Sequence, residues 1–195
     1  MLFKGDSMVY GKYKDARNAS WRCLLDYGIS ALPVNLSAIA VPAGIRVHKN
    51  SSCGILAEDE IGSSFLTGGD WHVYYDDMCN VGRQRFTIAH EFGHILMGHT
   101  LIECKHGRTF DTDKPEGEIS ADVFASRLLA PACVLWGLGL HRAEDIQRAC
   151  NISLEAAQYR ARRMEELYRR ERFLTHPLER KVYEQFFPFI EKNKQ

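Results

Sequence analysis

Five consecutive residues, His90-Glu91-Phe92-Gly93-His94, carry the side chains best suited to chemistry in this sequence. Residues four apart lie one turn along the same face of an α-helix, so both imidazoles can reach one ion at about 2.0–2.1 Å. Glu91 stands one step round the helix, where it can hold an attacking water and take its proton. This spacing is the HExxH arrangement of metalloproteases.

The residues around the motif are apolar, which argues against a solvated helix that carries histidines by chance. Ile88, Ala89 and Ile95 lie next to the two histidines, so the helix is predicted to be buried. An unpaired polar group in a buried helix is costly, by roughly 1–3 kcal/mol in protein mutational data. A metal ion would supply the partner that these side chains need.

Two carboxylates follow the motif, in the segment Glu118-Ile-Ser-Ala-Asp122. A catalytic zinc site needs a third protein ligand and an open fourth position, and Glu118 would complete a His₂Glu set. Asp122, one turn later, could accept the free ring N–H of a ligating histidine. The alternative is that both are ordinary acids in the first turn of a helix, stabilised by its dipole. The preceding HExxH motif favours the metal site, and the ligand types favour one Zn²⁺ per chain over manganese or iron.

Two segments resemble the ImmA/IrrE family of metallopeptidase-like proteins: RFTIAHEFGHILMGH at residues 85–99 and EISADVFASRLLAP at residues 118–131. In that family an HExxH helix precedes an ExxA(N/D)xFAxxLLxP segment. The one visible departure is Ala130, where a methionine is common before the proline. In organisation, the likeness covers residues 10–131.

The resemblance implies a zincin-like fold in which His90, His94 and Glu118 hold the metal and Glu91 is catalytic. It also implies the activity of a zinc-dependent endopeptidase on a protein substrate. Some family members cleave or inactivate a helix-turn-helix repressor, so a transcriptional repressor is the implied substrate and partner. We expect residues 1–131 to form the metallopeptidase domain and residues 132–195 to form a helical extension packed on it.

The elements that must position the motif begin with a helix over residues 14–27, which Gly28 should end. A short segment follows over residues 33–44. Four runs rich in β-branched or aromatic residues then predict a small, mostly antiparallel sheet: GIRVHKN, CGILAE, SSFL and WHVYY. Residues 71–75 should be its last strand, with Trp71, Val73 and Tyr75 on one face and His72 and Tyr74 on the other.

The remainder of the chain has helical periodicity. The motif helix should lie within residues 83–99, a polar loop over 105–118, and a second site helix over 119–129 ended by Pro131. Further helices are expected at the following places: 142–149, 154–168, and from Leu178 to a stop at Pro188. A sheet followed by helices predicts an α+β fold.

The predicted strand over residues 71–75 is also a candidate substrate-binding edge, where an extended peptide would add by β-augmentation. The oxyanion of the reaction needs a further donor, for which the sequence leaves four candidates: His72, Tyr74, Tyr75 and Arg83. His99 lies five residues after His94, about 140° round a regular helix, so it should point away from the metal and serve a capping role.

Composition limits the class and location of the protein. The 25 basic and 25 acidic side chains cancel, so no overall field directs the chain to nucleic acid or a membrane. No apolar run approaches the about 20 residues that cross a bilayer, and residues 1–15 lack the apolar stretch of a secretory signal. Six scattered cysteines fit three disulfides in number, but the missing signal favours reduced thiols and a cytoplasmic location. Most should be core residues, with Cys79 and Cys104 exposed.

Two other functions compete with the peptidase. Residues 142–168 have the outline of a helix-turn-helix, which would suit a DNA-binding regulator. The pairs Glu165–Arg169 and Glu166–Arg170 instead fit an ordinary solvated helix, and an excess of three positive charges over residues 141–195 is weak for a nucleic-acid module. The second alternative is a zinc-binding sensor or interaction protein without turnover.

Overall fold

The computed structural model describes residues 4–99 and 116–194, with side chains from residue 15 onward. Within these ranges, the elements in chain order are α1 (Lys4–Asp26), α2 (Ser37–Ala40), β1 (Ile45–Lys49), η1 (Asn50–Ser52), β2 (Gly62–Thr67), β3 (Asp70–Tyr75), α3 (Val81–Leu96), α4 (Glu116–Leu129), α5 (Ala132–Gly137), α6 (Ala143–Cys150), α7 (Leu154–Arg169) and α8 (Pro177–Asn193). The predicted α+β class is confirmed. Cys104 and most of the predicted loop over 105–118 lie outside the described residues.

The three strands form one sheet in the order β1-β3-β2. β2 pairs with β3 in antiparallel fashion, whereas β1 pairs with β3 in parallel, with Ile45 opposite Trp71. The sheet is therefore mixed, and the prediction of a mostly antiparallel sheet is corrected. β3 is the central strand, so the prediction that residues 71–75 form a substrate-binding edge is wrong.

The strand order follows from the two connections. A tight turn with positive φ at both Gly68 and Gly69 joins β2 to β3, which makes these strands neighbours. The longer connection over residues 50–61 begins with η1, and the strand predicted for CGILAE at residues 53–58 is absent because these residues form turns and irregular structure. Asn50 opens this connection, and its side chain accepts hydrogen bonds from the backbone N–H groups of Ile55 and Leu56. The chain therefore leaves the sheet after β1, and β1 occupies the other edge of β3.

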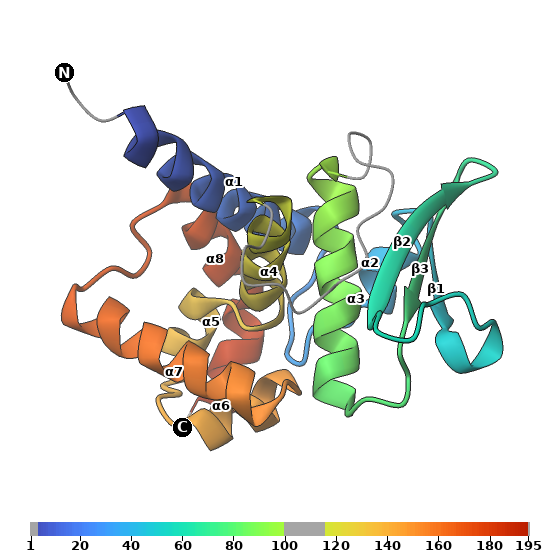
Figure 1. Cartoon of the computed structure of the whole chain (residues 1–195). Helices are drawn as coiled ribbons and strands as arrows, with labels where there is room; N and C mark the ends of the chain where they lie inside the picture. Colours follow the sequence, from blue (N-terminus) through green and yellow to red (C-terminus); the bar gives the residue numbers. More distant parts are fainter. Residues whose placement is uncertain (1–3, 100–115, 195) are drawn as a thin grey trace.

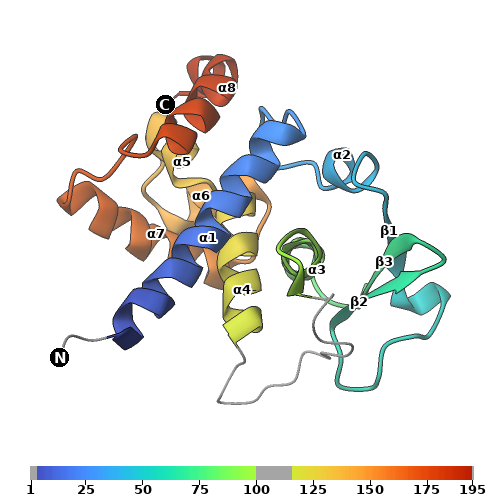
Figure 2. The ribbon, with the colours of Figure 1, turned by 90° about the horizontal axis from the view of Figure 1, so that it is seen from above.

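α3 lies between the sheet and the larger helices, as Figures 1 and 2 show from two directions. The helix begins where the Asn80 side chain accepts a hydrogen bond from the backbone N–H of Arg83 at 3.0 Å, an ordinary N-cap. It ends at Leu96, two residues before Gly98 adopts a φ of +77°. Apolar contacts on both sides bury the middle of α3, as the sequence predicted.

α4 packs against α3 on one side and α1 on the other (Figure 2). The approach to α3 is close because Gly93 has no side chain: a Cβ there would lie 3.2 Å from the Cα of Ala121. Phe92 of α3 and Phe124 of α4 are fully buried in the core. This packing fixes the position of the second site segment relative to the HExxH motif.

The last helix contradicts the prediction that Pro188 ends it. α8 continues to Asn193 with Pro188 in its interior. A proline inside a helix costs about 3 kcal/mol. Val182 and Phe186 before it and Ile190 after it are fully buried, so core packing on both sides outweighs this cost. At the other end of the chain, α1 extends further towards the N-terminus than predicted and stops before Gly28, which has a φ of +62°.

One helical stretch, Glu116–Gly137, has the length and apolar composition of a membrane span. In its most apolar part, 61% is buried inside the molecule. The buried core helix of a globular domain can have the same length and apolar composition as a membrane span. The stretch contains α4 and α5, which line the core beside α3, α1 and α8.

The five cysteines in the described ranges are free thiols. Cys23, Cys133 and Cys150 are buried, and burial raises the pKa of each to about 12, so these thiols are neutral core groups. Cys79 is half-buried, whereas Cys53 is exposed. Three of the five are thus core residues, as expected for most of them, whereas the exposure of Cys53 was not anticipated.

Candidate metal centre

Three side chains predicted as metal ligands come together between α3 and α4. The Nε2 atoms of His90 and His94 lie 3.0 Å apart. The Glu118 carboxylate lies 3.2 Å from His90 Nε2 and 3.0 Å from His94 Nε2 through its two oxygens. Potential ligand atoms of these residues all lie within 4.8 Å of one another. The i, i+4 spacing on α3 brings the two histidines together, and the packing of α4 against α3 places Glu118 beside them.

The arrangement has the dimensions of a zinc site. Ligand atoms at about 2.0–2.1 Å in tetrahedral directions are separated from one another by about 3.3–3.4 Å. The observed separations of 3.0–3.2 Å are close to that value. All three residues are buried, with His90 only 1% exposed and Glu118 7% exposed. The residues therefore fit a small cation with one position left for a further ligand.

The protonation of His90 supports the same conclusion. Its Nδ1 lies 2.9 Å from Asp122 Oδ1, and a carboxylate can only accept, so Nδ1 carries the proton. In the neutral ring Nε2 is then unprotonated, and its lone pair lies towards His94 Nε2 and the Glu118 carboxylate, where a cation can bind it. Asp122 orients the ring as expected for a carboxylate behind a metal ligand.

The Glu118 side chain is in its metal-binding form. Burial acts to raise the pKa of its carboxyl, but the adjacent His90 and His94 imidazoles outweigh burial and hold that pKa well below its ordinary value. Glu118 is therefore a carboxylate at neutral pH. Its place in the first turn of α4 also suits a negative charge.

Asp122→Ala is expected to weaken zinc binding by about 10–100-fold, because the ring of His90 loses the acceptor that orients it. A competitive titration against a chromophoric zinc chelator measures the change. Asp145→Ala removes a carboxylate that pairs with Arg148 on α6, and it serves as the matched control. Equal zinc affinity in both variants would show that Asp122 does not support the metal ligand.

Glu91 is held in place by β2, a contact that the sequence did not predict. Its Oε2 accepts a hydrogen bond from the Ser64 hydroxyl at 2.8 Å, and Glu91 is only 4% exposed. The strand reaches α3 because Gly62 has no side chain: a Cβ there would lie 2.2 Å from Thr87 Cγ2. Ser64 has no motif or spacing that marks it, because its role depends on the placement of β2.

The sequence predicted that His99 points away from the centre, and this prediction is wrong. Its Nδ1 lies 3.3 Å from Nδ1 of His94, with the two rings edge to face. The predicted angle assumed a regular helix through residue 99, but α3 ends at Leu96 and Gly98 turns the chain back. His99 therefore contacts the outer side of a ligand imidazole.

The sheet separates the four candidates for stabilising an oxyanion. Ser64 stands opposite Val73 in the ladder and faces α3, so Tyr75 is on that face and His72 and Tyr74 are on the other. This alternation is as predicted. His72 Nδ1 lies 3.0 Å from His48 Nε2 on the outer face, away from Glu91. Two candidates for the oxyanion donor remain: Tyr75 of β3, on the face towards α3, and Arg83, in the first turn of α3.

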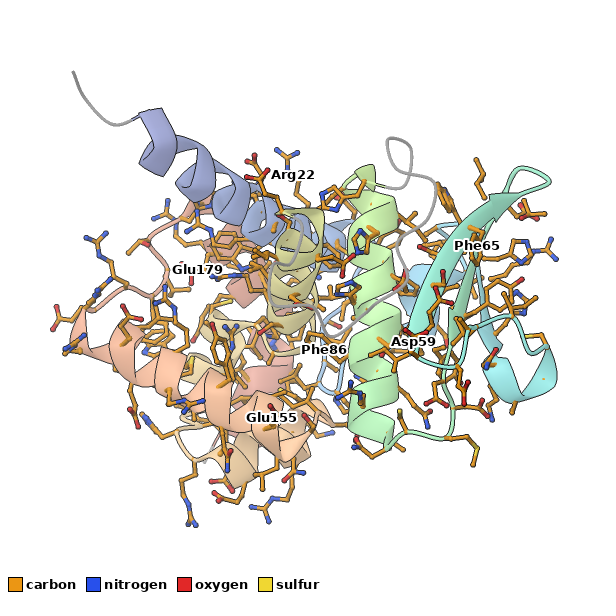
Figure 3. The ribbon with its side chains drawn as sticks, in the orientation of Figure 1. Arg22, Asp59, Phe65, Phe86, Glu155 and Glu179 are labelled. Atoms are coloured by element: carbon orange, nitrogen blue, oxygen red, sulfur yellow. The ribbon has the colours of Figure 1, made fainter. Side chains whose placement is uncertain are left out.

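A cavity of about 580 Å³ adjoins the centre between α3, α4 and α7. Phe86 and Asp122 line the wall nearest His90, whose ring centroid lies 6.4 Å from that of Phe86. Figure 3 shows Phe86 and, on the opposite wall, Glu155 of α7. This volume is within the range of small-molecule and side-chain binding sites.

The helix-turn-helix outline is present as α6, a left-handed residue at Asn151 and α7. Its arginines are not all on the surface. Arg160 is buried, and Arg170 forms an ion pair with Glu166 at 2.9 Å. The positive charge of α7 is thus directed partly inward, which is not how a recognition helix presents its side chains.

Comparison with known proteins agrees with the geometry. No curated protein matches the chain. The model of a peptidase family, described as the IrrE N-terminal-like domain, matches residues 44–162. This range includes the HExxH motif, Glu118 and Asp122, and it confirms the resemblance seen in the sequence. The chain belongs to this family of IrrE N-terminal-like metallopeptidase domains.

Proposed function

We propose that the chain is a zinc-dependent endopeptidase. The observation that carries the proposal is the convergence of His90, His94 and Glu118, buried and at zinc-ligand spacing, with the carboxylate of Glu91 beside them. Membership of a metallopeptidase family supports the same reaction class. The ligand types favour zinc over manganese or iron.

Zinc bound by these three residues would polarise the scissile carbonyl and make the attacking water more acidic. Glu91 accepts the proton of that water on a carboxylate oxygen and then delivers it to the amide nitrogen that leaves. The Ser64 hydroxyl holds Oε2 of Glu91, so one oxygen is fixed and the other is free to move the proton. Tyr75 and Arg83 are the candidate donors to the oxyanion.

The substrate would bind in extended form along β2. This strand pairs with β3 on one side, and no other strand in the described ranges pairs with its second edge. Ser64 of the same strand contacts Glu91, so a peptide added to β2 would pass the catalytic carboxylate. β2 thus takes the role that the sequence had given to residues 71–75.

A helix-turn-helix transcriptional repressor is the proposed substrate and partner, and the cytoplasm is the proposed location. The substrate class rests on the resemblance to ImmA/IrrE proteins. Free, buried thiols at Cys23, Cys133 and Cys150 support a reducing compartment.

Removal of the metal is the direct test. A library of extended peptides, or a candidate repressor, is incubated with the zinc-loaded chain, and cleavage is followed by mass spectrometry. We expect chelation to abolish cleavage, because Glu91 alone cannot activate water sufficiently. One equivalent of zinc should restore it. Cleavage that persists after zinc has been removed would exclude the proposed mechanism.

A further inference from the structure

Arginine side chains gather around a second cavity, of about 610 Å³, on the side of α4 away from α3. Residues of α1, α4, α5, α7, α8 and the connection before α8 form its wall, and Figure 3 shows Glu179 on this side. The arginines of the wall are Arg17, Arg127, Arg160, Arg163, Arg170 and Arg172. Two glutamates also line the cavity, so the wall has an excess of four positive charges.

The two glutamates are already engaged elsewhere. Glu166 forms ion pairs with both Arg163 and Arg170 along α7. Glu179 accepts a hydrogen bond from the backbone N–H of Thr175 at 3.2 Å. Burial raises the pKa of Glu179, while the charge of Arg17 acts in the opposite direction. Two carboxylates cannot balance six guanidinium groups, so the wall keeps an excess of positive charge.

Four arginines of the wall have no ion pair with any carboxylate in the described part of the chain: Arg17, Arg127, Arg160 and Arg172. Arg160 is only 4% exposed, and one of its terminal nitrogens donates to the carbonyl of Ala130. Its buried Nε atom has no hydrogen-bond partner. A buried guanidinium without a counter-charge is costly, so a ligand that supplies one would bind favourably.

The arginines also repel one another. Burial, together with the charges of Arg160, Arg17 and Arg163, lowers the pKa of Arg127 to about 9. Burial lowers the pKa of Arg160 to about 10, and the charge of Arg163 acts in the same direction. Both guanidinium groups are still protonated at pH 7, so the repulsion is present at neutral pH and an anion would relieve it.

We propose that this cavity binds a small molecule that carries a di- or triphosphate group, through the guanidinium groups of Arg17, Arg127 and Arg160. The planar guanidinium matches two phosphate oxygens at once, which makes arginine well suited to such groups. A cavity of about 610 Å³ is within the range of small-molecule sites. A nucleic-acid strand fits less well, because buried Arg160 cannot reach phosphates on the outer surface.

Arg127 and Arg160 also line the cavity of about 580 Å³ that adjoins the metal centre, so the two cavities share a wall. The proposed anion-binding groups nevertheless lie away from the metal ligands. Glu118 and Arg127 both lie on α4, nine residues apart, which places them about half a turn apart and therefore on opposite sides of the helix. They are also separated by about 13 Å along the helix axis. Phosphate binding should therefore not require zinc, and its test is independent of the peptidase proposal.

Isothermal titration calorimetry with inorganic triphosphate, at about 0.15 M salt, tests the proposal. We expect saturable binding of one triphosphate per chain. Arg17→Gln and Arg127→Gln should each weaken it by about tenfold or more, because each removes a charge-assisted hydrogen bond. Arg169→Gln removes an exposed charge from α7 that does not line the cavity, and this variant should bind as the parent does. Glu118→Gln should also bind normally, which excludes binding of triphosphate to the zinc.

Thermal unfolding separates a binding role from a structural role. Without ligand, Arg127→Gln should unfold at the same or a higher temperature than the parent chain, because a repelling charge is removed. At the same concentration, triphosphate should raise the unfolding temperature of the parent chain more than that of this variant. Absence of binding, or equal weakening by Arg169→Gln, would overturn the proposal. Triphosphate binding that Glu118→Gln abolishes would place the anion at the metal and also overturn it.

Discussion

Glu118→Gln is expected to bind zinc more than about 100-fold less tightly than the parent chain, a larger loss than that of a supporting residue. Glutamine has nearly the same shape but offers a neutral amide in place of a carboxylate. His90 and His94 would remain, and two ligands are too few for a stable catalytic site. Elemental analysis of both proteins should find about one zinc per chain in the parent and little in the variant.

Glu116→Gln is the matched control, because Glu116 is an exposed acid in the same first turn of α4. It should retain zinc if the site depends on Glu118 itself. Equal zinc contents in Glu118→Gln and the parent would instead support the alternative that Glu118 and Asp122 are ordinary acids in the first turn of a helix, stabilised by its dipole. A parent chain that fails to take up added zinc would reject the metal centre altogether.

Glu91→Gln is expected to lower the rate of peptide hydrolysis by about 10²–10⁴-fold while zinc remains bound. The amide can still accept the hydrogen bond from the Ser64 hydroxyl, so the position of the side chain should change little. It cannot accept the proton of the attacking water, so the loss should appear in kcat. Steady-state kinetics on a cleaved peptide, with the zinc content of the same preparation, measures both properties.

The zinc content is the internal control for this variant, since His90, His94 and Glu118 are unchanged. A variant that loses both zinc and hydrolysis would indicate that Glu91 maintains the site and is not specifically the base. Full biological activity in Glu91→Gln would favour the alternative of a zinc sensor or interaction protein without turnover.

The sequence was most informative where function depends on local spacing. The i, i+4 rule places His90 and His94 on one face of α3 without any knowledge of the fold. The grouping of Glu118 and Asp122 one turn apart is local in the same way. Only the contact between the two segments is long-range, and it was expected because two histidines need a third metal ligand and the family resemblance assigns that role to Glu118.

Features that depend on distant contacts were not predicted from the sequence. Alternation in β3 gave the correct faces, but a strand pattern does not specify which neighbour lies on which side, so its central position was missed. Ser64 has no local signal at all. Pro188 remains within α8 because burial of its neighbours outweighs a local preference, which sequence rules alone could not weigh.

The location of the ligands on two helices has a consequence for folding. His94 and Glu118 are 24 residues apart in the chain, so an ion that joins them closes a loop that the unfolded chain leaves open. Metal that binds the folded form alone adds about 1.4 kcal/mol to the free energy of unfolding for each tenfold rise in its concentration above Kd. With zinc bound as proposed, the same ion would act as a reversible cross-link, and the supply of zinc would set the conformational stability of the α3–α4 pair as well as its chemistry.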